Sequence, residues 1–293
     1  LGAEALENAA GSAPAVMLTH ERTTFFFFPG VPRELEYLIE AHLQPWLANQ
    51  PGSRPRHSAT FKTFGRTESG IAQLLEELPA DPRVTVAYRA SFPRIQVTLH
   101  VEEPEPQRAQ ALLNEQSAAL RQLLKGLIYS ESHERDFAGA VAHALLEHAD
   151  HPTISVAESC TGGLITKLLT DVPGVSGCFD RGWITYSNAA KSDMLGVPEA
   201  LITTHGAVSE VVARAMAEGA RERAGSTIGL ATTGVAGPGG GSPTKPVGTV
   251  HIALATPSGT HHRLLNLSFG REKNRTLSAW AALELVRRWA LDL

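Results

Sequence analysis

Cysteine is scarce in this chain. Its 293 residues include only Cys160 and Cys178, and the two do not form a Cys-x-x-Cys pair. Disulfide frameworks and structural zinc sites both need closely spaced cysteine or histidine ligands. The loosely spaced His143, His148 and His151 do not make such a set. We therefore expect no disulfide framework and no required metal. Because there is also no signal-peptide pattern, we expect a cytoplasmic protein.

Long apolar runs and an excess of one charge are also missing. No apolar stretch approaches the roughly 20 residues that span a bilayer, so we expect no membrane partner. The 26 basic and 30 acidic residues give a net charge of -4, which argues against a protein whose main work is to grip phosphate backbones. Hydrophobic residues make up 43% of the chain. That proportion is ample for packed cores, and the length predicts about two domains.

Apolar periodicity outlines the secondary structure. Residues 23–28 are typical of a buried strand, residues 35–46 of a helix, and residues 49–55 of a linker. The pattern of residues 56–127 predicts strand, helix, two strands and helix. From residue 137 onward, strands and helices alternate, which is typical of a layered α/β domain with helices on both faces of a sheet.

One polar hexapeptide interrupts this last segment: Glu158-Ser159-Cys160-Thr161-Gly162-Gly163. It follows an apolar run at residues 153–157 and precedes a helical pattern at residues 164–170, so a buried strand should end there and a helix begin. Free N–H groups at a helix start favour an anion or a reacting oxygen. Serine is also a preferred helix cap. On this pattern alone, Ser159 could either react or cap the helix.

Four more polar segments follow in the same part of the chain. They are Tyr186-Ser187-Asn188-Ala189-Ala190-Lys191, His205-Gly206-Ala207-Val208-Ser209, Thr233-Gly234-Val235-Ala236-Gly237-Pro238, and the glycine-rich residues 239–249. With the hexapeptide, they resemble the C-terminal domain of the competence/damage-inducible protein CinA family, over about residues 134–293. Upstream, residues 28–34 resemble the end of the family's molybdopterin-binding-like N-terminal domain, and residues 63–69 resemble its KH-like middle domain.

The resemblance and the periodicity together predict the architecture. We expect an α/β protein with a three-layer α/β/α C-terminal domain at residues 131–293. A small α+β KH-like domain at residues 54–130 and a remnant of an N-terminal α/β domain at residues 1–53 precede it. Since the chain opens at Leu1 and retains little of that first domain, we expect it to be a fragment. Between Arg54 and Lys125 it has 10 basic and 8 acidic residues. The KH-like domain also lacks a Gly-x-x-Gly loop, so we expect no nucleic-acid partner.

The resemblance also implies an activity, the hydrolytic deamidation of nicotinamide mononucleotide to nicotinic acid mononucleotide and ammonia. Ser159 would be the nucleophile and Lys191 its base. A lysine that is neutral near pH 7 must lose about 3 pKa units. If Asn188 caps a short helix, Lys191 is its third residue, where the helix dipole disfavours a cation. Burial or a nearby cation such as Arg271 would have to supply the rest.

The remaining site residues take supporting roles in this interpretation. Tyr186 would orient Lys191 or relay its proton, and Thr233 would hydrogen-bond the serine, the substrate amide or the oxyanion. Cys160 would lie buried behind Ser159. The expected substrate-binding residues are Thr161, Gly162, Gly163, Asn188, Gly237, Gly239, Gly240 and Arg271. No cofactor is expected for this domain.

Two other functions stay open from the sequence. One is a binding or regulatory module, associated with competence or DNA damage, that catalyses nothing. The other is a part of a bifunctional protein whose N-terminal domain, largely missing here, hydrolyses ADP-ribose. For the deamidase interpretation, the expected partners are a small mononucleotide and further copies of the chain in a homo-oligomer.

Overall fold

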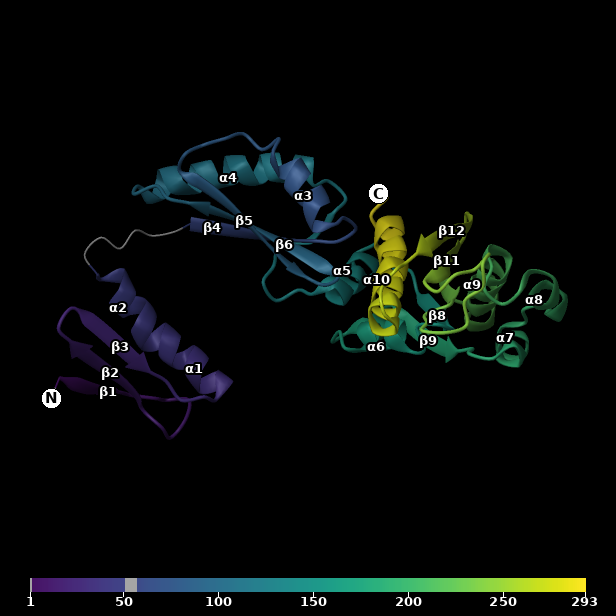
Figure 1. Ribbon diagram of the computed structural model, residues 1–293, viewed down its shortest axis with the longest axis horizontal. Helices are drawn as coiled ribbons and strands as arrows, with labels where there is room; N and C mark the ends of the chain where they lie inside the picture. Colours follow the sequence, from purple (N-terminus) through teal and green to yellow (C-terminus); the bar gives the residue numbers. More distant parts are fainter. Residues whose placement is uncertain (1, 51–56) are drawn as a thin grey trace. The chain divides into compact units, whose positions relative to one another are not determined.

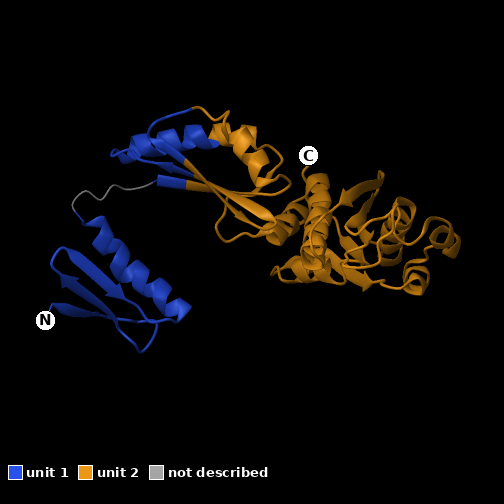
Figure 2. Ribbon diagram, viewed as in Figure 1, with its two compact units in different colours: residues 1–58, 80–85, 99–117 blue, residues 59–79, 86–98, 118–293 orange. Residues whose placement is uncertain are grey.

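The computed structural model describes residues 2–50 and 57–293. They form two compact units (Figure 2). Unit 1 comprises Leu1–Ser58, Ala80–Thr85 and Leu99–Ser117, and unit 2 comprises Ala59–Pro79, Val86–Thr98 and Ala118–Leu293. The boundary predicted between residues 53 and 54 falls outside the described residues.

The N-terminal part of unit 1 is a three-stranded antiparallel sheet with a helical segment after it. The strands are β1 (Ala3–Leu6), β2 (Ala15–His20) and β3 (Thr23–Phe27), followed by α1 (Pro32–Leu38), a π-helical turn (Ile39–Leu43) and α2 (Gln44–Ala48). Phe26 packs on the small core around Leu38, but Phe25 and Phe27 are 44% and 56% exposed. The prediction of a buried strand was wrong here, because alternate side chains of a strand point to opposite faces.

The KH-like segment has the predicted order of elements plus one short strand. It comprises β4 (His57–Thr63), α3 (Glu68–Leu75), β5 (Val84–Ser91), β6 (Arg94–Val101), α4 (Pro106–Leu123) and β7 (Ile128–Ser130), with strand order β5-β6-β4-β7. Thr67 caps α3 by accepting a hydrogen bond from Gly70 N–H. The β7 strand was missed because three residues are too few to show a period.

The C-terminal domain is built on a five-stranded sheet with the order β12-β11-β10-β8-β9. Its strands are β8 (Ile154–Glu158), β9 (Phe179–Ile184), β10 (Ile228–Gly234), β11 (Thr249–Thr256) and β12 (Gly259–Asn266). β8 pairs in parallel with both β9 and β10, whereas β11 is antiparallel to its neighbours. Every residue of β8 is buried, as is typical of a parallel strand covered on both faces.

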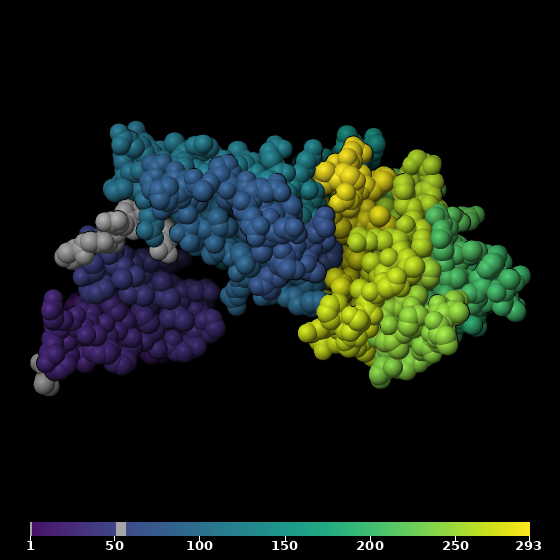
Figure 3. All heavy atoms as spheres, turned by 45° about the horizontal axis from the view of Figure 1, so that its top comes forward, coloured from purple at the N-terminus to yellow at the C-terminus, as the bar shows by residue number. Residues whose placement is uncertain are grey.

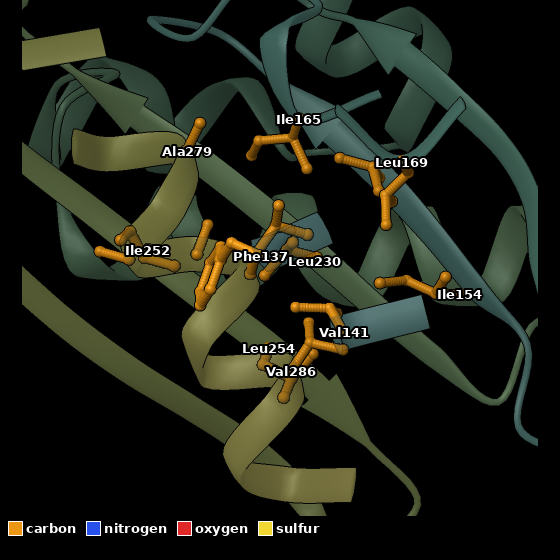
Figure 4. Close-up of a cluster of buried hydrophobic side chains, with 14 of the residues drawn as sticks. Phe137, Val141, Ile154, Ile165, Leu169, Leu230, Ile252, Leu254, Ala279 and Val286 are labelled. Carbon is orange, nitrogen blue, oxygen red and sulfur yellow. The ribbon is translucent and has the colours of Figure 1, made fainter. Parts of the chain in front are cut away.

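Helices cover both faces of this sheet (Figure 1). On one side lie α5 (Phe137–Leu146), α6 (Leu164–Thr170) and α10 (Arg271–Ala290), whose apolar side chains meet those of β8, β10 and β11 in the main core (Figure 4). A second core packs α7 (Asn188–Leu195), α8 (Glu199–His205) and α9 (Glu210–Ala224) on the other side. The three-layer α/β/α prediction is confirmed for this domain.

Chain direction fixes where the polar segments meet. Because β8, β9 and β10 are parallel neighbours, their C-terminal ends lie at one edge of the sheet. Ligand sites of open α/β sheets are found at this edge. The hexapeptide follows β8, Tyr186 lies two residues beyond β9, and Thr233 lies near the end of β10. In the part of the chain that is described, no helix is long and apolar enough to cross a membrane.

Candidate active site

The turn after β8 is held by the carboxylate of Glu158, which is fully buried. It accepts hydrogen bonds from the backbone N–H groups of Gly163, Ile165 and Thr166 at 3.0, 3.0 and 2.8 Å, and from the Thr166 hydroxyl at 2.8 Å. A carboxylate is well placed at a helix start because it satisfies the free N–H groups and the positive end of the helix dipole. Glu158 thus fixes the turn that carries Ser159.

The same bonds correct one of our expectations. Thr161, Gly162 and Gly163 were expected to bind the substrate at the start of α6, but the Glu158 carboxylate already occupies that helix start. Gly162 and Gly163 have φ of +58° and +92°, a backbone conformation that glycine adopts without strain. The Thr161 side chain is fully buried and its hydroxyl bonds to that of Thr232 at 2.7 Å. These residues therefore build the turn that carries Ser159.

Ser159 and Lys191 meet although 32 positions separate them. The Nζ atom of Lys191 lies 3.3 Å from Ser159 Oγ. It also donates to the backbone carbonyls of Thr185, Tyr186 and Ser187 at 2.9, 3.3 and 3.4 Å. Both side chains are almost enclosed, with 8% of Ser159 and 1% of Lys191 exposed. This separation is slightly longer than the about 2.6–3.2 Å over which a base takes a proton directly, and such contacts commonly shorten when substrate binds.

Burial lowers the pKa of Lys191 below its usual value of 10.5, because the charged ammonium loses its hydration; the nearby Cys160 opposes this shift. Arg271, which we expected to help lower this pKa, is not among the causes. Its Nη1 atom instead donates to the Gly237 carbonyl at 2.7 Å. Desolvation is therefore the physical cause that weakens the preference of this lysine for its charged form.

The helix around Lys191 begins differently from the prediction. Ser187, not Asn188, is the cap of α7, and its hydroxyl accepts from Ala190 N–H at 3.0 Å. Serine and asparagine are both good caps, so the sequence pattern did not distinguish these two adjacent positions. Lys191 is consequently the fourth residue of α7, and Asn188 is the first.

A pocket of about 210 Å³ opens at this pair. Its wall is formed by predicted site residues together with parts of two loops, namely Ser159, Cys160, Tyr186, Asn188, Lys191, Ala207, Val208, Thr233, Gly234, Ala236 and Arg271. Gly237, Gly239 and Gly240 are not among the described residues that line it. The preceding segment contributes Thr233, Gly234 and Ala236, whereas no residue of the glycine-rich stretch 239–249 is among the described lining residues.

Tyr186 and Thr233 lie in the wall with contacts that differ from their predicted roles. The Tyr186 side chain is 63% exposed, and it is the backbone carbonyl that holds Lys191. The Thr233 hydroxyl donates to the carbonyl of Ala207 at 2.8 Å, which ties the end of β10 to the loop before α9. While it donates there, this hydroxyl can still accept a hydrogen bond from Ser159 or from a substrate N–H, but to donate to an oxyanion it must exchange that partner.

Cys160 is buried, and burial raises the pKa of its thiol to about 12. A thiol with that pKa carries almost no thiolate at neutral pH and is a poor nucleophile. Although Cys160 borders the pocket, the environment therefore does not activate it.

Several residues of the site were missed from the sequence. The Thr185 and Ala207 carbonyls act through the backbone, for which side-chain patterns give no signal. Arg275, one turn after Arg271 on α10, donates through Nη2 to the Thr161 carbonyl at 2.7 Å. The contact of Glu158 with the helix start could have been predicted, since an acidic residue close before a helix is a common partner for its free N–H groups.

The fold and site define a class: layered α/β proteins with a buried serine–lysine pair at the carboxyl edge of a parallel sheet. A family profile described as "CinA C-terminal domain" matches residues 135–290, and one described as "Damage-inducible protein CinA KH domain" matches residues 58–130. The chain belongs to the CinA family of competence/damage-inducible proteins.

Related proteins and solved structures agree with this assignment. A CinA-like protein of Syntrophotalea carbinolica is 40% identical over 289 residues, covering 98% of this chain and 69% of the relative. A CinA-like protein of Geotalea uraniireducens is 39% identical over 290 residues, covering 98% and 68%. The crystal structure of competence/damage inducible protein CihA from Agrobacterium tumefaciens matches with a TM-score of 0.51 and 41% identity, over 55% of this chain and 99% of that one.

Proposed function

We propose that the C-terminal domain is an amidohydrolase that converts nicotinamide mononucleotide to nicotinic acid mononucleotide and ammonia. The observation that supports it most is the buried Lys191 amine 3.3 Å from Ser159 Oγ at the pocket. A serine hydroxyl needs an adjacent base to become a nucleophile, and a lysine serves as that base when burial lowers its pKa. The choice of substrate rests on the resemblance to the CinA family.

The reaction follows from these two groups. Ser159 Oγ attacks the carboxamide carbon while its proton passes to Lys191 Nζ. The tetrahedral intermediate then collapses, and the Lys191 ammonium returns the proton to the departing NH2 group, which leaves as ammonia. Water next attacks the acyl-serine, with Lys191 again accepting and then returning a proton, so that the carboxylic acid and free Ser159 are formed.

The pocket suits the reacting end of the substrate. Pockets that enclose a whole drug-sized ligand measure about 300–1,000 Å³, whereas this one measures about 210 Å³. In the proposal it encloses the carboxamide and the pyridine ring, and the ribose phosphate lies across the rim. Arg271 on that rim is exposed and has a planar guanidinium that suits phosphate oxygens.

Ammonia release from nicotinamide mononucleotide tests the proposal. The wild-type chain should release ammonia and one equivalent of the acid. Ser159→Ala should lose at least about 10³-fold in kcat, while Ser268→Ala, a change of the same size at an exposed position, should keep the wild-type rate. Undiminished turnover by a folded Ser159→Ala protein would end the proposal. No release by the wild-type chain from this substrate would overturn the assigned substrate.

A further inference from the structure

A second pocket, of about 460 Å³, lies in unit 2 and shares no described residue with the pocket at Ser159. Its floor is apolar. Phe64, Ile95 and Leu265 there are buried, and α10 contributes Leu277 and Ala281. Figure 3 shows this region from one side, where the blue surface of the KH-like segment borders the yellow surface of the chain's last strand and helix. The volume is within the range that holds a small organic molecule.

The rim of this pocket is basic. Arg66, Arg94 and Arg263 line it, and Glu68 is the single carboxylate among its described lining residues. Within the described part of the chain, neither Arg66 nor Arg263 forms an ion pair with a carboxylate. The pocket lining is therefore locally positive, although the whole chain has a net charge of -4. Exposed guanidinium groups without carboxylate partners are suited to an anionic group of a ligand.

Two exposed aromatic side chains, those of Phe92 and Phe269, also line this pocket. Phe92 and Phe269 contact edge to face with their centroids 5.6 Å apart, and they are 44% and 46% exposed. The Lys273 ammonium lies 5.5 Å from the centroid of the Phe92 ring. A flat apolar molecule entering between the rings and the floor would remove this aromatic surface from water, which is favourable.

We propose that this pocket binds a small organic anion, whose flat apolar body rests on the floor beside Phe92 and Phe269 and whose anionic group pairs with Arg66 and Arg263. A small molecule fits better than a protein partner. Phe92 and Phe269 are the only large apolar side chains exposed among the described lining residues, whereas a stable protein interface buries about 800 Å² on each side. The proposal does not depend on the amidase function.

Two fluorescent probes test it on the whole chain. The anionic probe is 8-anilinonaphthalene-1-sulfonate, and the neutral one is N-phenyl-1-naphthylamine, which has a similar apolar body. The double variant Arg66→Glu/Arg263→Glu should weaken the anionic probe at least about tenfold and change the neutral probe less than about threefold. Arg89→Glu, a single charge reversal at an exposed position outside the lining, should alter neither. Phe92→Ala should weaken both probes.

Three results would overturn the proposal. The first is the absence of saturable binding of the anionic probe to the wild-type chain. The second is an affinity for that probe that the double charge reversal leaves unchanged. The third is a dimer that forms with rising protein concentration, as seen by light scattering, and that the double variant abolishes. If the neutral probe also binds only to the monomer, the pocket is an interface between two copies. Ammonia release should be the same in all three variants. Failure of the anion-binding proposal can therefore be distinguished from failure of the amidase proposal.

Discussion

The carboxylate of Glu158 accepts hydrogen bonds from both the backbone N–H and the hydroxyl of Thr166, each at 2.8 Å. Two further backbone N–H groups, of Gly163 and Ile165, complete its shell. The residue that precedes the proposed nucleophile is thus the one that closes the turn around it. The position of Ser159 Oγ relative to Lys191 consequently depends on a charge buried next to it in the chain.

Glu158→Gln should destabilise the protein by about 2–4 kcal/mol, because an amide presents an NH2 group to some of these four donors and leaves them unpaired. Thr166→Val removes one donor and should cost only about 1 kcal/mol. Chemical denaturation of the two variants measures the difference. Equal and small losses would show that the carboxylate is not the clamp of this turn.

The pH dependence of activity should report Lys191. Since the base must be neutral and its pKa lies below 10.5, kcat/KM should rise with pH up to that lowered pKa and then level off. Protonation at lower pH removes the base, so the loss is on the acid side. Lys191→Arg should lose at least about 10²-fold in kcat, because a guanidinium stays charged at every working pH. A kcat/KM that falls as the pH rises, or that stays constant at every pH below 10.5, would contradict the role given to this lysine.

Cys160→Ala should keep deamidase activity within a fewfold of wild type, since burial raises the thiol pKa to about 12. The folded wild-type protein should also resist iodoacetamide at neutral pH, because alkylation needs a thiolate. Intact-mass measurement before and after unfolding provides the comparison. Rapid alkylation of folded protein accompanied by loss of activity would point to Cys160 as the nucleophile.

Glu284 and Arg287 on α10 form a buried ion pair at 2.7 Å, with each side chain about 95% covered. Arg287 also donates to the carbonyl of Gly126 at 2.8 Å. Glu284→Ala should therefore cost about 3–5 kcal/mol by leaving a buried guanidinium unpaired. The double variant Glu284→Leu/Arg287→Leu should cost less, since it leaves no buried charge. Thermal unfolding of both variants tests this order, and a milder single variant would contradict it.

The sequence was a good guide to the layers of the C-terminal domain. The alternation of strands and helices predicted a sheet covered on both faces, and the structure has that arrangement. Parallel strands also bring their carboxyl ends together, so the meeting of the segments at Ser159, Tyr186 and Thr233 followed from topology alone. These features depend on local periodicity and on rules of chain direction, which a single sequence contains.

The contacts made by individual polar atoms could not be predicted in the same way. Ser187 and Asn188 are both good caps, and which of them caps α7 depends on whether the helix begins one residue earlier or later. Whether Arg271 faces Lys191 or the Gly237 carbonyl depends on how α10 packs. The exposure of Phe25 and Phe27 likewise reflects which face of a small sheet is covered, and an all-aromatic run gives no alternation from which to predict it.

An acyl group on Ser159 is the intermediate that the proposed reaction requires, and mass spectrometry can detect it. Wild-type protein mixed with nicotinamide mononucleotide, quenched in acid within the first turnover and digested, should yield the peptide containing Ser159 with the mass of one acyl group added. Ser159→Ala should yield only the unmodified peptide and release no ammonia. Ammonia release by Ser159→Ala, or the same added mass on another residue of the wild-type protein, would contradict the account.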